Sequence, residues 1–169
     1  MKIFCLILTV VLFLTVSPSA NAQNKSVVTY NSFGGVKIGM TVSKASKAFG
    51  VSLVRGEGYE NSCYYVSPKQ GFKNVSFMVT NGSIARIDIY GKGYATDKGA
   101  KVGDTEARIK SLYKGMVKAS RHPYDEKGHY LEVKFAGGNY SIIFETDGRR
   151  VTSFRAGKSE EVGYIEGCS

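Results

Sequence analysis

The chain has 169 residues, and its 23 lysines and arginines outnumber 14 aspartates and glutamates, so the formal net charge is +9. Hydrophobic residues make up 43% and charged residues 22%, which is typical of a folded globular protein and argues against an intrinsically disordered chain. Charges that alternate in sign through the C-terminal half argue against a coiled coil. The length allows one domain or two very small ones.

The N-terminus has the pattern of a secretory signal peptide. Lys2 precedes a short apolar stretch, and Pro18 and the small residues Ala20 and Ala22 follow it as an A-x-A cleavage site. We predict that residues 1–22 are the signal. An uncleaved membrane anchor is the alternative, but it would need a longer apolar stretch without serine and proline. The mature protein would then be periplasmic or secreted and would have no transmembrane segment.

Cleavage of this signal leaves two cysteines, Cys63 and Cys168. Two cysteines in an exported chain have only one intramolecular pairing, so we predict a disulfide between them. The bridge would close a loop of roughly 100 residues and stabilise the fold by up to ~4.7 kcal/mol in the chain-entropy model. A reactive thiol pair is the alternative interpretation.

A polar segment over 23–34, which we expect to be flexible apart from a short strand near Val27, leads into a pattern that occurs twice. Residues 35–50 and 99–114 share Gly, Lys, Gly and Thr at the same spacing, with an offset of 64. Thr41 or Thr105 can cap a short helix in each copy. The predicted buried faces of these helices are Val42, Ala45, Ala48 and Phe49 in the first copy and Ile109, Leu112 and Tyr113 in the second.

Each predicted helix leads into strands with alternating apolar residues, joined by turn signals such as Asn81-Gly82 and Asp147-Gly148. The predicted strands cover 63–66, 74–80 and 84–90 in the first copy and 130–136, 140–146 and 151–156 in the second.

The predicted fold class is α+β, a tandem repeat of a short helix followed by an antiparallel β-meander. A unit of about 64 residues is small for independent stability, so the two sheets should pack together or merge. We assign the repeats to 35–93 and to 94–169, the latter with a C-terminal tail. The alternative is a single α+β domain whose halves resemble each other by chance.

The segment Ile38-Gly39-Met40-Thr41, the short helix and the closing Phe49-Gly50 resemble the helix-opening motif of SmpA/OmlA-type envelope proteins. Two such units in one secreted chain resemble the β-lactamase inhibitor protein fold, in which tandem helix-plus-sheet units present a concave sheet surface. The second copy departs from the motif, with Asp104 in place of the methionine. The resemblance implies a non-catalytic protein that binds another protein, as an inhibitor or as an envelope assembly component.

The sequence has no G-x-S-x-G, H-E-x-x-H, P-loop or metal-type C-x-x-C motif. His122, Asp125 and His129 could in principle hold a metal, but we interpret them as polar loop residues before a strand. We therefore predict no metal, no cofactor and no enzymatic activity. A hydrolase with an unrecognised site is the remaining alternative.

The first repeat is the basic half, because residues 23–93 carry nine lysines and arginines against three acids, whereas residues 94–169 carry thirteen against eleven. Such a surface favours an anionic partner, which includes an acidic protein, a lipid head group or an acidic glycan. Export makes nucleic acid a poor candidate. The alternative is that the lysines only keep the protein soluble.

Eleven tyrosines and no tryptophan suit a binding face, since tyrosine supplies a broad contact area with little entropy to lose. Adjacent strand residues point to opposite faces, so one of Tyr64 and Tyr65 should lie in the core. The predicted binding residues are Tyr64, Arg86, Tyr90, Lys92 and Tyr94. The leading hypothesis is a secreted, inhibitor-like protein that recognises another protein through a sheet face, and the alternative is an envelope component that binds an anionic glycan or lipid.

Overall fold

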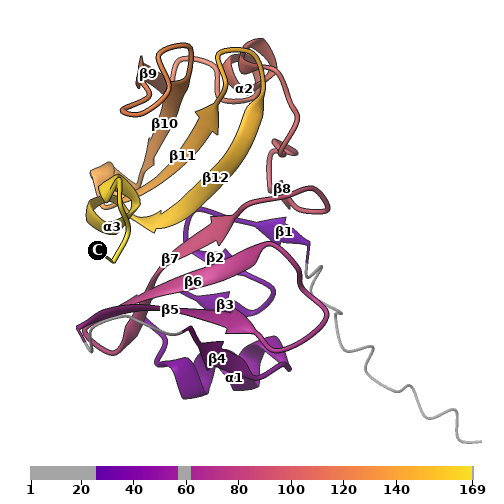
Figure 1. Ribbon diagram of the computed structural model, residues 1–169, viewed down its shortest axis with the longest axis vertical. Helices are drawn as coiled ribbons and strands as arrows, with labels where there is room; N and C mark the ends of the chain where they lie inside the picture. Colours follow the sequence, from indigo (N-terminus) through magenta and orange to yellow (C-terminus); the bar gives the residue numbers. More distant parts are fainter. Residues whose placement is uncertain (1–25, 57–61, 169) are drawn as a thin grey trace, which may run out of the picture.

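The computed structural model describes residues 26–56 and 62–168 (Figure 1). The predicted signal peptide, residues 1–22, lies outside the described residues. The first half of the molecule contains β1 (Val27–Val28), β2 (Ser32–Phe33), β3 (Val36–Lys37), α1 (Val42–Phe49), β4 (Leu53–Arg55), β5 (Cys63–Pro68), β6 (Val75–Thr80) and β7 (Ser83–Ile89). The second half contains β8 (Ala95–Thr96), α2 (Glu106–Leu112), β9 (Val117–Arg121), β10 (His129–Phe135), the single-turn η1 (Ala136–Gly138), β11 (Tyr140–Thr146), β12 (Val151–Lys158) and α3 (Ser159–Gly163).

The predicted α+β tandem repeat is confirmed, and its two sheets are merged. Each half supplies four consecutive antiparallel strands to one eight-stranded sheet, in the order β4-β5-β6-β7-β12-β11-β10-β9. The halves meet where β7 pairs with β12 antiparallel. A smaller sheet has the order β3-β2-β1-β8, and within it β1 and β8 are parallel. Figure 1 shows α1 beside the first half of the large sheet and α2 beside the second.

The sequence predicted three strands in each repeat, whereas each repeat contributes four strands to the large sheet. The strands that it missed are β4 and β9. Both are edge strands of the large sheet. Leu53 is the only buried residue of β4, and β9 is almost entirely exposed. Strands without a buried face have no apolar alternation, so the pattern that predicts the inner strands is absent from them.

The two copies open their helices in the same way. The Thr41 hydroxyl accepts a hydrogen bond from the Lys44 backbone N–H at 3.4 Å, and the Thr105 hydroxyl accepts one from that of Arg108 at 3.2 Å. Each threonine has an extended backbone, as an N-cap residue requires. The predicted caps are therefore confirmed in both repeats.

A backbone contact just before each helix is also duplicated. The Gly39 N–H donates to the carbonyl of Ile84 at 2.8 Å, and the Gly103 N–H donates to that of Val151 at 2.8 Å. The two glycines have φ of 91° and 94°, a region that L side chains rarely adopt, so glycine is required at both places. Each repeat thus ties the start of its helix to its own last strand.

The helices bury the centres of the predicted stripes, whereas Val42 and Leu112 are only half-buried against the core. Ala45 and Phe49 of the first copy, and Ile109 and Tyr113 of the second, are fully buried. Ala48 was predicted to be buried but is exposed. It lies at the edge of a narrow stripe centred on Ala45 and Phe49, the two buried residues of α1.

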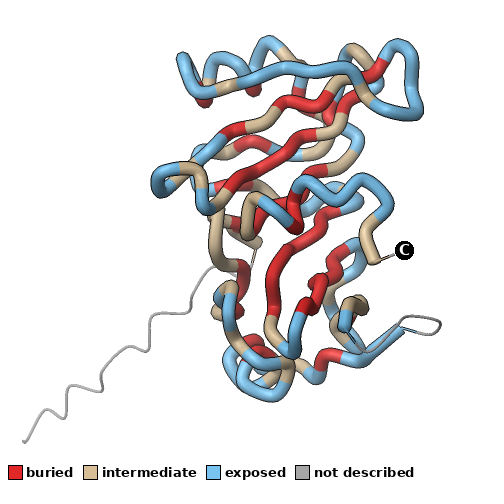
Figure 2. Tube along the Cα trace, turned by 90° about the vertical axis from the view of Figure 1, so that its left-hand side faces the viewer, coloured by how far each residue is buried: buried red, intermediate tan, exposed pale blue. Residues whose placement is uncertain are grey.

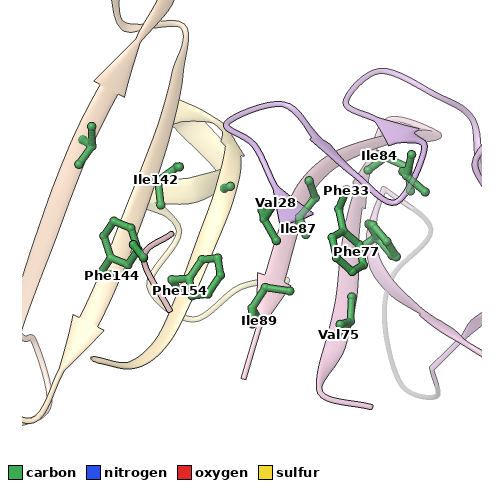
Figure 3. Close-up of a cluster of buried hydrophobic side chains, with 14 of the residues drawn as sticks. Val28, Phe33, Val75, Phe77, Ile84, Ile87, Ile89, Ile142, Phe144 and Phe154 are labelled. Atoms are coloured by element: carbon green, nitrogen blue, oxygen red, sulfur yellow. The ribbon is translucent and has the colours of Figure 1, made fainter. Parts of the chain in front are cut away.

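One hydrophobic core runs through both halves. Figure 2 shows buried residues along the inner strands and exposed residues mainly in the loops and at the sheet edges. Phe77 and Ile87 from the first half belong to the same buried cluster as Phe144 and Phe154 from the second (Figure 3). The halves therefore form one folding unit, as expected for repeats too small to be stable alone.

The prediction of a flexible segment over 23–34 was wrong for the described residues 26–34. The predicted short strand near Val27 is present as β1, and β2 follows it. Val28 and Phe33 are fully buried, and the Phe33 ring centroid lies 5.6 Å from that of Phe49. Only two apolar side chains in this polar stretch enter the core, so the sequence carries no periodic signal.

The second face of the large sheet lies opposite this core and is partly covered by the end of the chain. The segment 159–168, which begins with α3, crosses this face, and Figure 1 shows α3 and the C-terminus beside the boundary between the halves. The predicted Cys63–Cys168 disulfide is confirmed, and it joins β5 to this segment across 105 residues of sequence. In the part of the chain that the structure describes, no helix is long and apolar enough to cross a membrane.

Candidate binding face

Polar side chains gather on the second face of the large sheet, where the two repeats meet. Arg86 and Asp88 alternate on β7 with core residues, so both point away from the core. Arg155 on β12 lies directly opposite Asp88 in the strand register. Tyr65 projects onto the same face from β5. This face therefore combines two guanidinium groups, a carboxylate and a phenol.

Arg86, which was predicted as a binding side chain, lines the cavity on this face but is buried and fully hydrogen-bonded. It is only 4% exposed, its Nε donates to Asp88 at 3.0 Å, and its Nη2 donates to the Tyr65 hydroxyl. Its Nη1 donates to the carbonyl oxygens of Glu161 at 2.7 Å and Tyr164 at 3.1 Å. With all three guanidinium nitrogens engaged, Arg86 holds the C-terminal segment against the sheet.

Arg155 holds the same segment from the second half. Its Nε donates to the carbonyl of Val162 at 2.6 Å, and its Nη1 pairs with the carboxylate of Glu145. The guanidinium lies 4.9 Å from the centre of the Tyr130 ring, within cation–π distance. Each repeat thus provides one arginine that donates a hydrogen bond to a backbone carbonyl of the C-terminal segment.

Burial dominates the titration behaviour of this face. It raises the pKa of Asp88, and the nearby guanidinium groups of Arg86 and Arg155 partly oppose the effect. Burial, with the Asp88 carboxyl as the next cause, also raises the pKa values of Tyr65 and Tyr90. The two phenols therefore keep their protons at neutral pH and can serve as hydrogen-bond donors.

A cavity of about 270 Å³ opens beside these groups, between the sheet and the C-terminal segment. Its lining residues include Tyr65, Asp88, Tyr90, Glu145, Arg155, Ile165 and Glu166. Tyr90 is 54% exposed and Ile165 is 50% exposed at this cavity. Tyr124, which is 69% exposed, donates its hydroxyl proton to Glu166. We call Tyr90, Tyr124 and Ile165 the rim cluster.

The two adjacent tyrosines on β5 lie on opposite faces of the sheet. Tyr64 is partly buried, packs against the hydrophobic core and lies 4.2 Å from the Arg55 guanidinium, measured to the ring centre. Tyr65 is the residue that lines the cavity. Strand alternation predicts that the two side chains point to opposite faces of the sheet, but it does not predict which of these faces is buried in the core.

Lys92 and Tyr94 lie away from the rim cluster, at the junction between the repeats. Both line two adjoining hollows of about 690 and 630 Å³ near β1 and β8. Tyr94 is partly buried, and its hydroxyl donates to the Lys73 carbonyl at 2.9 Å. Tyr90 thus lines the cavity of the rim cluster, whereas Tyr94 lines these two hollows.

Sequence reasoning missed Tyr124 and Ile165 as members of this face. Tyr124 lies in the loop between β9 and β10, and Ile165 carries no signal because its position depends on how the chain end folds back. The segment reaches the sheet through contacts with residues 75 to 105 positions earlier. A local pattern cannot encode contacts of that range.

The histidines take separate partners. The His122 Nδ1 accepts hydrogen bonds from the backbone N–H groups of Tyr124 and Asp125, both at 3.1 Å. The His129 Nδ1 lies 2.8 Å from a Glu106 carboxylate oxygen. Among the described residues, no group of three or more histidine, cysteine, aspartate and glutamate side chains is arranged to hold a metal ion.

No protein-family model and no curated protein matches the sequence. Among solved structures, the uncharacterised protein YfeY from Escherichia coli is similar, with a TM-score of 0.52 and 16% identity over 78% of this chain and 99% of that one. A DUF4309 family protein, YjgB from Bacillus subtilis, gives a TM-score of 0.40 and 16% identity over 70% of this chain and 78% of its own. The first similarity shows a shared fold only. The second is too weak to support a shared fold. The resemblance to SmpA/OmlA and β-lactamase inhibitor proteins stays a prediction.

Proposed function

We propose that this is a non-catalytic protein of the periplasm or the extracellular space that binds another protein through the rim cluster and the cavity beside it. The Cys63–Cys168 disulfide indicates an oxidising compartment. The signal-peptide pattern of residues 1–22 supports export from the cell interior. Both features support a binding event outside the cytoplasm.

The observation that carries the proposal is the exposure of Tyr90 and Ile165, which line one cavity, and of Tyr124, whose hydroxyl donates to the lining residue Glu166. Large side chains of this kind gain free energy when a partner removes them from water, and tyrosine is enriched among the residues that dominate protein interfaces. A cavity bordered by such residues offers a place for a side chain of the partner. The tyrosine hydroxyls can donate hydrogen bonds to it, and the Glu145 carboxylate can accept them.

The rim cluster is also held in place before any partner arrives. The Tyr90 backbone N–H donates to the Asn74 carbonyl at 2.9 Å. Ile165 lies in the segment that Arg86 and the disulfide hold to the sheet. A surface that is already rigid loses less conformational entropy on binding, so more of the contact energy appears as affinity.

The test uses affinity capture from the periplasmic extract of the source cells with three baits. These are the wild-type protein, a rim variant with Tyr90→Ala, Tyr124→Ala and Ile165→Asp, and a control variant with Val54→Asp and Met116→Ala. The control residues are also exposed apolar side chains, at β4 and before β9, away from the cavity. We expect a stoichiometric partner on the wild-type and control baits and at least a tenfold loss on the rim variant. The same proteins on all three baits would refute the proposal.

A further inference from the structure

The two hollows beside Lys92 and Tyr94 form a second surface, which a hollow lined by Tyr65, Phe72, Asn74 and Tyr90 links to the cavity of the rim cluster. They share Ser26, Lys92, Gly93 and Tyr94 as lining residues, so they adjoin and together form one elongated depression. We call it the junction groove. Figure 1 shows β1 and β8, which border it, on the side of the repeat boundary away from α3.

Three loops each place one lysine on the junction groove. Lys73 lies between β5 and β6, Lys92 between β7 and β8, and Lys101 shortly after β8. All three are exposed, and none forms an ion pair with a described residue. The stem of Lys92 extends across the groove, since its Cε lies 4.0 Å from where a Cβ would stand on Gly103.

The groove has no free acidic group to balance these lysines. Asp104 is the only acid among the described lining residues, and it is 8% exposed. Its carboxylate accepts a hydrogen bond from the Lys101 backbone N–H at 3.0 Å and pairs with Arg108 at 3.4 Å. Positive charge concentrated in a depression without a counter-charge attracts an anionic ligand.

Aromatic rings form part of the wall between the lysines. Tyr94 and Phe72 both line the groove. The Tyr94 ring is fixed by its hydrogen bond to Lys73 and by an edge-to-face contact with Phe33 at 5.5 Å. A fixed ring beside cationic side chains can contact the C–H face of a sugar ring while the lysines pair with its acidic substituents.

We infer that the junction groove binds a segment of an acidic polysaccharide, with Lys73, Lys92 and Lys101 pairing with its carboxylate, sulfate or phosphate groups. The two adjoining hollows fit a chain of sugars better than a single small anion. A membrane surface fits less well, because a membrane-binding site presents protruding apolar side chains. The large exposed apolar residues of the described chain, Val54, Tyr90, Met116, Tyr124, Tyr164 and Ile165, all lie outside the groove.

The test measures binding of the full mature chain to polygalacturonate, to dextran sulfate, to uncharged dextran and to phosphatidylglycerol vesicles at low salt. The groove variant carries Lys73→Gln, Lys92→Gln and Lys101→Gln. The matched control carries Lys114→Gln, Lys118→Gln and Lys127→Gln, which removes the same charge from exposed lysines outside the groove. We expect wild-type binding to at least one acidic polysaccharide but not to dextran, at least tenfold weaker binding by the groove variant, and a change within twofold for the control.

Three outcomes would overturn the inference. Equal losses in both triple variants would show attraction by net charge alone. If the wild-type protein bound neither acidic polysaccharide, this class of ligand would be excluded. If it bound only the vesicles, and did so through the three lysines, the groove would be a site for membrane lipid. The groove variant leaves the rim cluster intact, so these results are independent of the protein-capture experiment.

Discussion

The two repeats are alike where the backbone needs a particular residue and differ where side chains meet solvent or each other. Thr41 and Thr105 make the same cap, and Gly39 and Gly103 make the same backbone contact. The ends of the helices differ, because α1 ends at Gly50 with a left-handed backbone of φ 71°, whereas α2 ends at Tyr113 with φ −115°. The shared framework is therefore the turn and cap that start each helix.

The repeats also differ in how each helix is anchored at its first turn. No acidic residue stands in the first turn of α1, whereas α2 begins at Glu106. The Glu106 carboxylate accepts a hydrogen bond from the Thr146 hydroxyl at 2.6 Å and lies 2.8 Å from His129 Nδ1. Glu106 thus ties the first turn of α2 to β10 and β11 in the second repeat.

The largest asymmetry is the C-terminal segment, which belongs to the second repeat and covers part of the sheet face of both. Removing the disulfide with Cys63→Ser and Cys168→Ser frees a loop of 105 residues. We expect the free energy of unfolding to fall by about 4 kcal/mol in urea denaturation. A loss under about 1 kcal/mol would mean that the arginine contacts hold the segment without the bridge.

The second prediction concerns the buried pair in the first repeat. Arg86→Met leaves the Asp88 carboxyl buried without its partner, so we expect a loss of about 3 kcal/mol in unfolding free energy. The double variant Arg86→Met, Asp88→Leu removes the unpaired charge and should recover at least half of that loss. A double variant no more stable than the single one would show that the contacts of Arg86 to the C-terminal segment outweigh the ion pair.

The third prediction tests whether the two caps are equivalent. Thr41→Ala and Thr105→Ala each remove one hydrogen bond at a helix start, and each should cost about 1 kcal/mol of unfolding free energy. The sites share no partner, so the double variant should lose the sum of the two values in the same denaturation measurement. Unequal costs would show that the anchoring of α2 by Glu106 compensates for its cap.

The smallest expected effect is a pH dependence confined to the second repeat. Burial raises the pKa of Glu106, but hydrogen bonds from Thr146 and His129 outweigh it and hold the value below the usual 4.5. A lowered carboxyl pKa stabilises the fold above the usual value and loses that contribution as the pH falls through the folded value. Wild type should therefore exceed Glu106→Gln in thermal stability above about pH 4.5, and the two should converge in acid. A constant difference from pH 3 to pH 6 would contradict this.

Local patterns predicted the parts of the fold that depend on neighbouring residues. The spacing around Thr41 and Thr105, the turn at Asn81-Gly82 and the alternation within the inner strands all act within a few positions, and the structure contains each of them. The disulfide followed from the predicted signal cleavage, which leaves two cysteines in an exported chain. The edge strands β4 and β9 were missed, and the short strands β1 and β2 were only partly predicted. Each of these strands buries too few residues to produce an alternating apolar pattern.

The candidate binding face was predicted much less well than the fold. Arg86 was expected at the surface, but its strand is central and the chain end covers it. Tyr64 and Tyr65 were correctly expected to separate, yet the choice between them depended on which face α1, α2 and the smaller sheet cover. Lys92 lies on an exposed loop as its sequence neighbourhood suggests, but its grouping with Lys73 and Lys101 required three loops to meet.

The amino-acid order by itself determined that this protein is a duplicated helix-and-meander unit with one bridge, because caps, turns and side-chain alternation are set by residues close together in the chain. Only the tertiary structure decided which sheet face remains open, where the rim cluster gathers and how the junction groove collects its charge. Those features arise from contacts between residues many positions apart. Such contacts depend on the packing of the whole molecule.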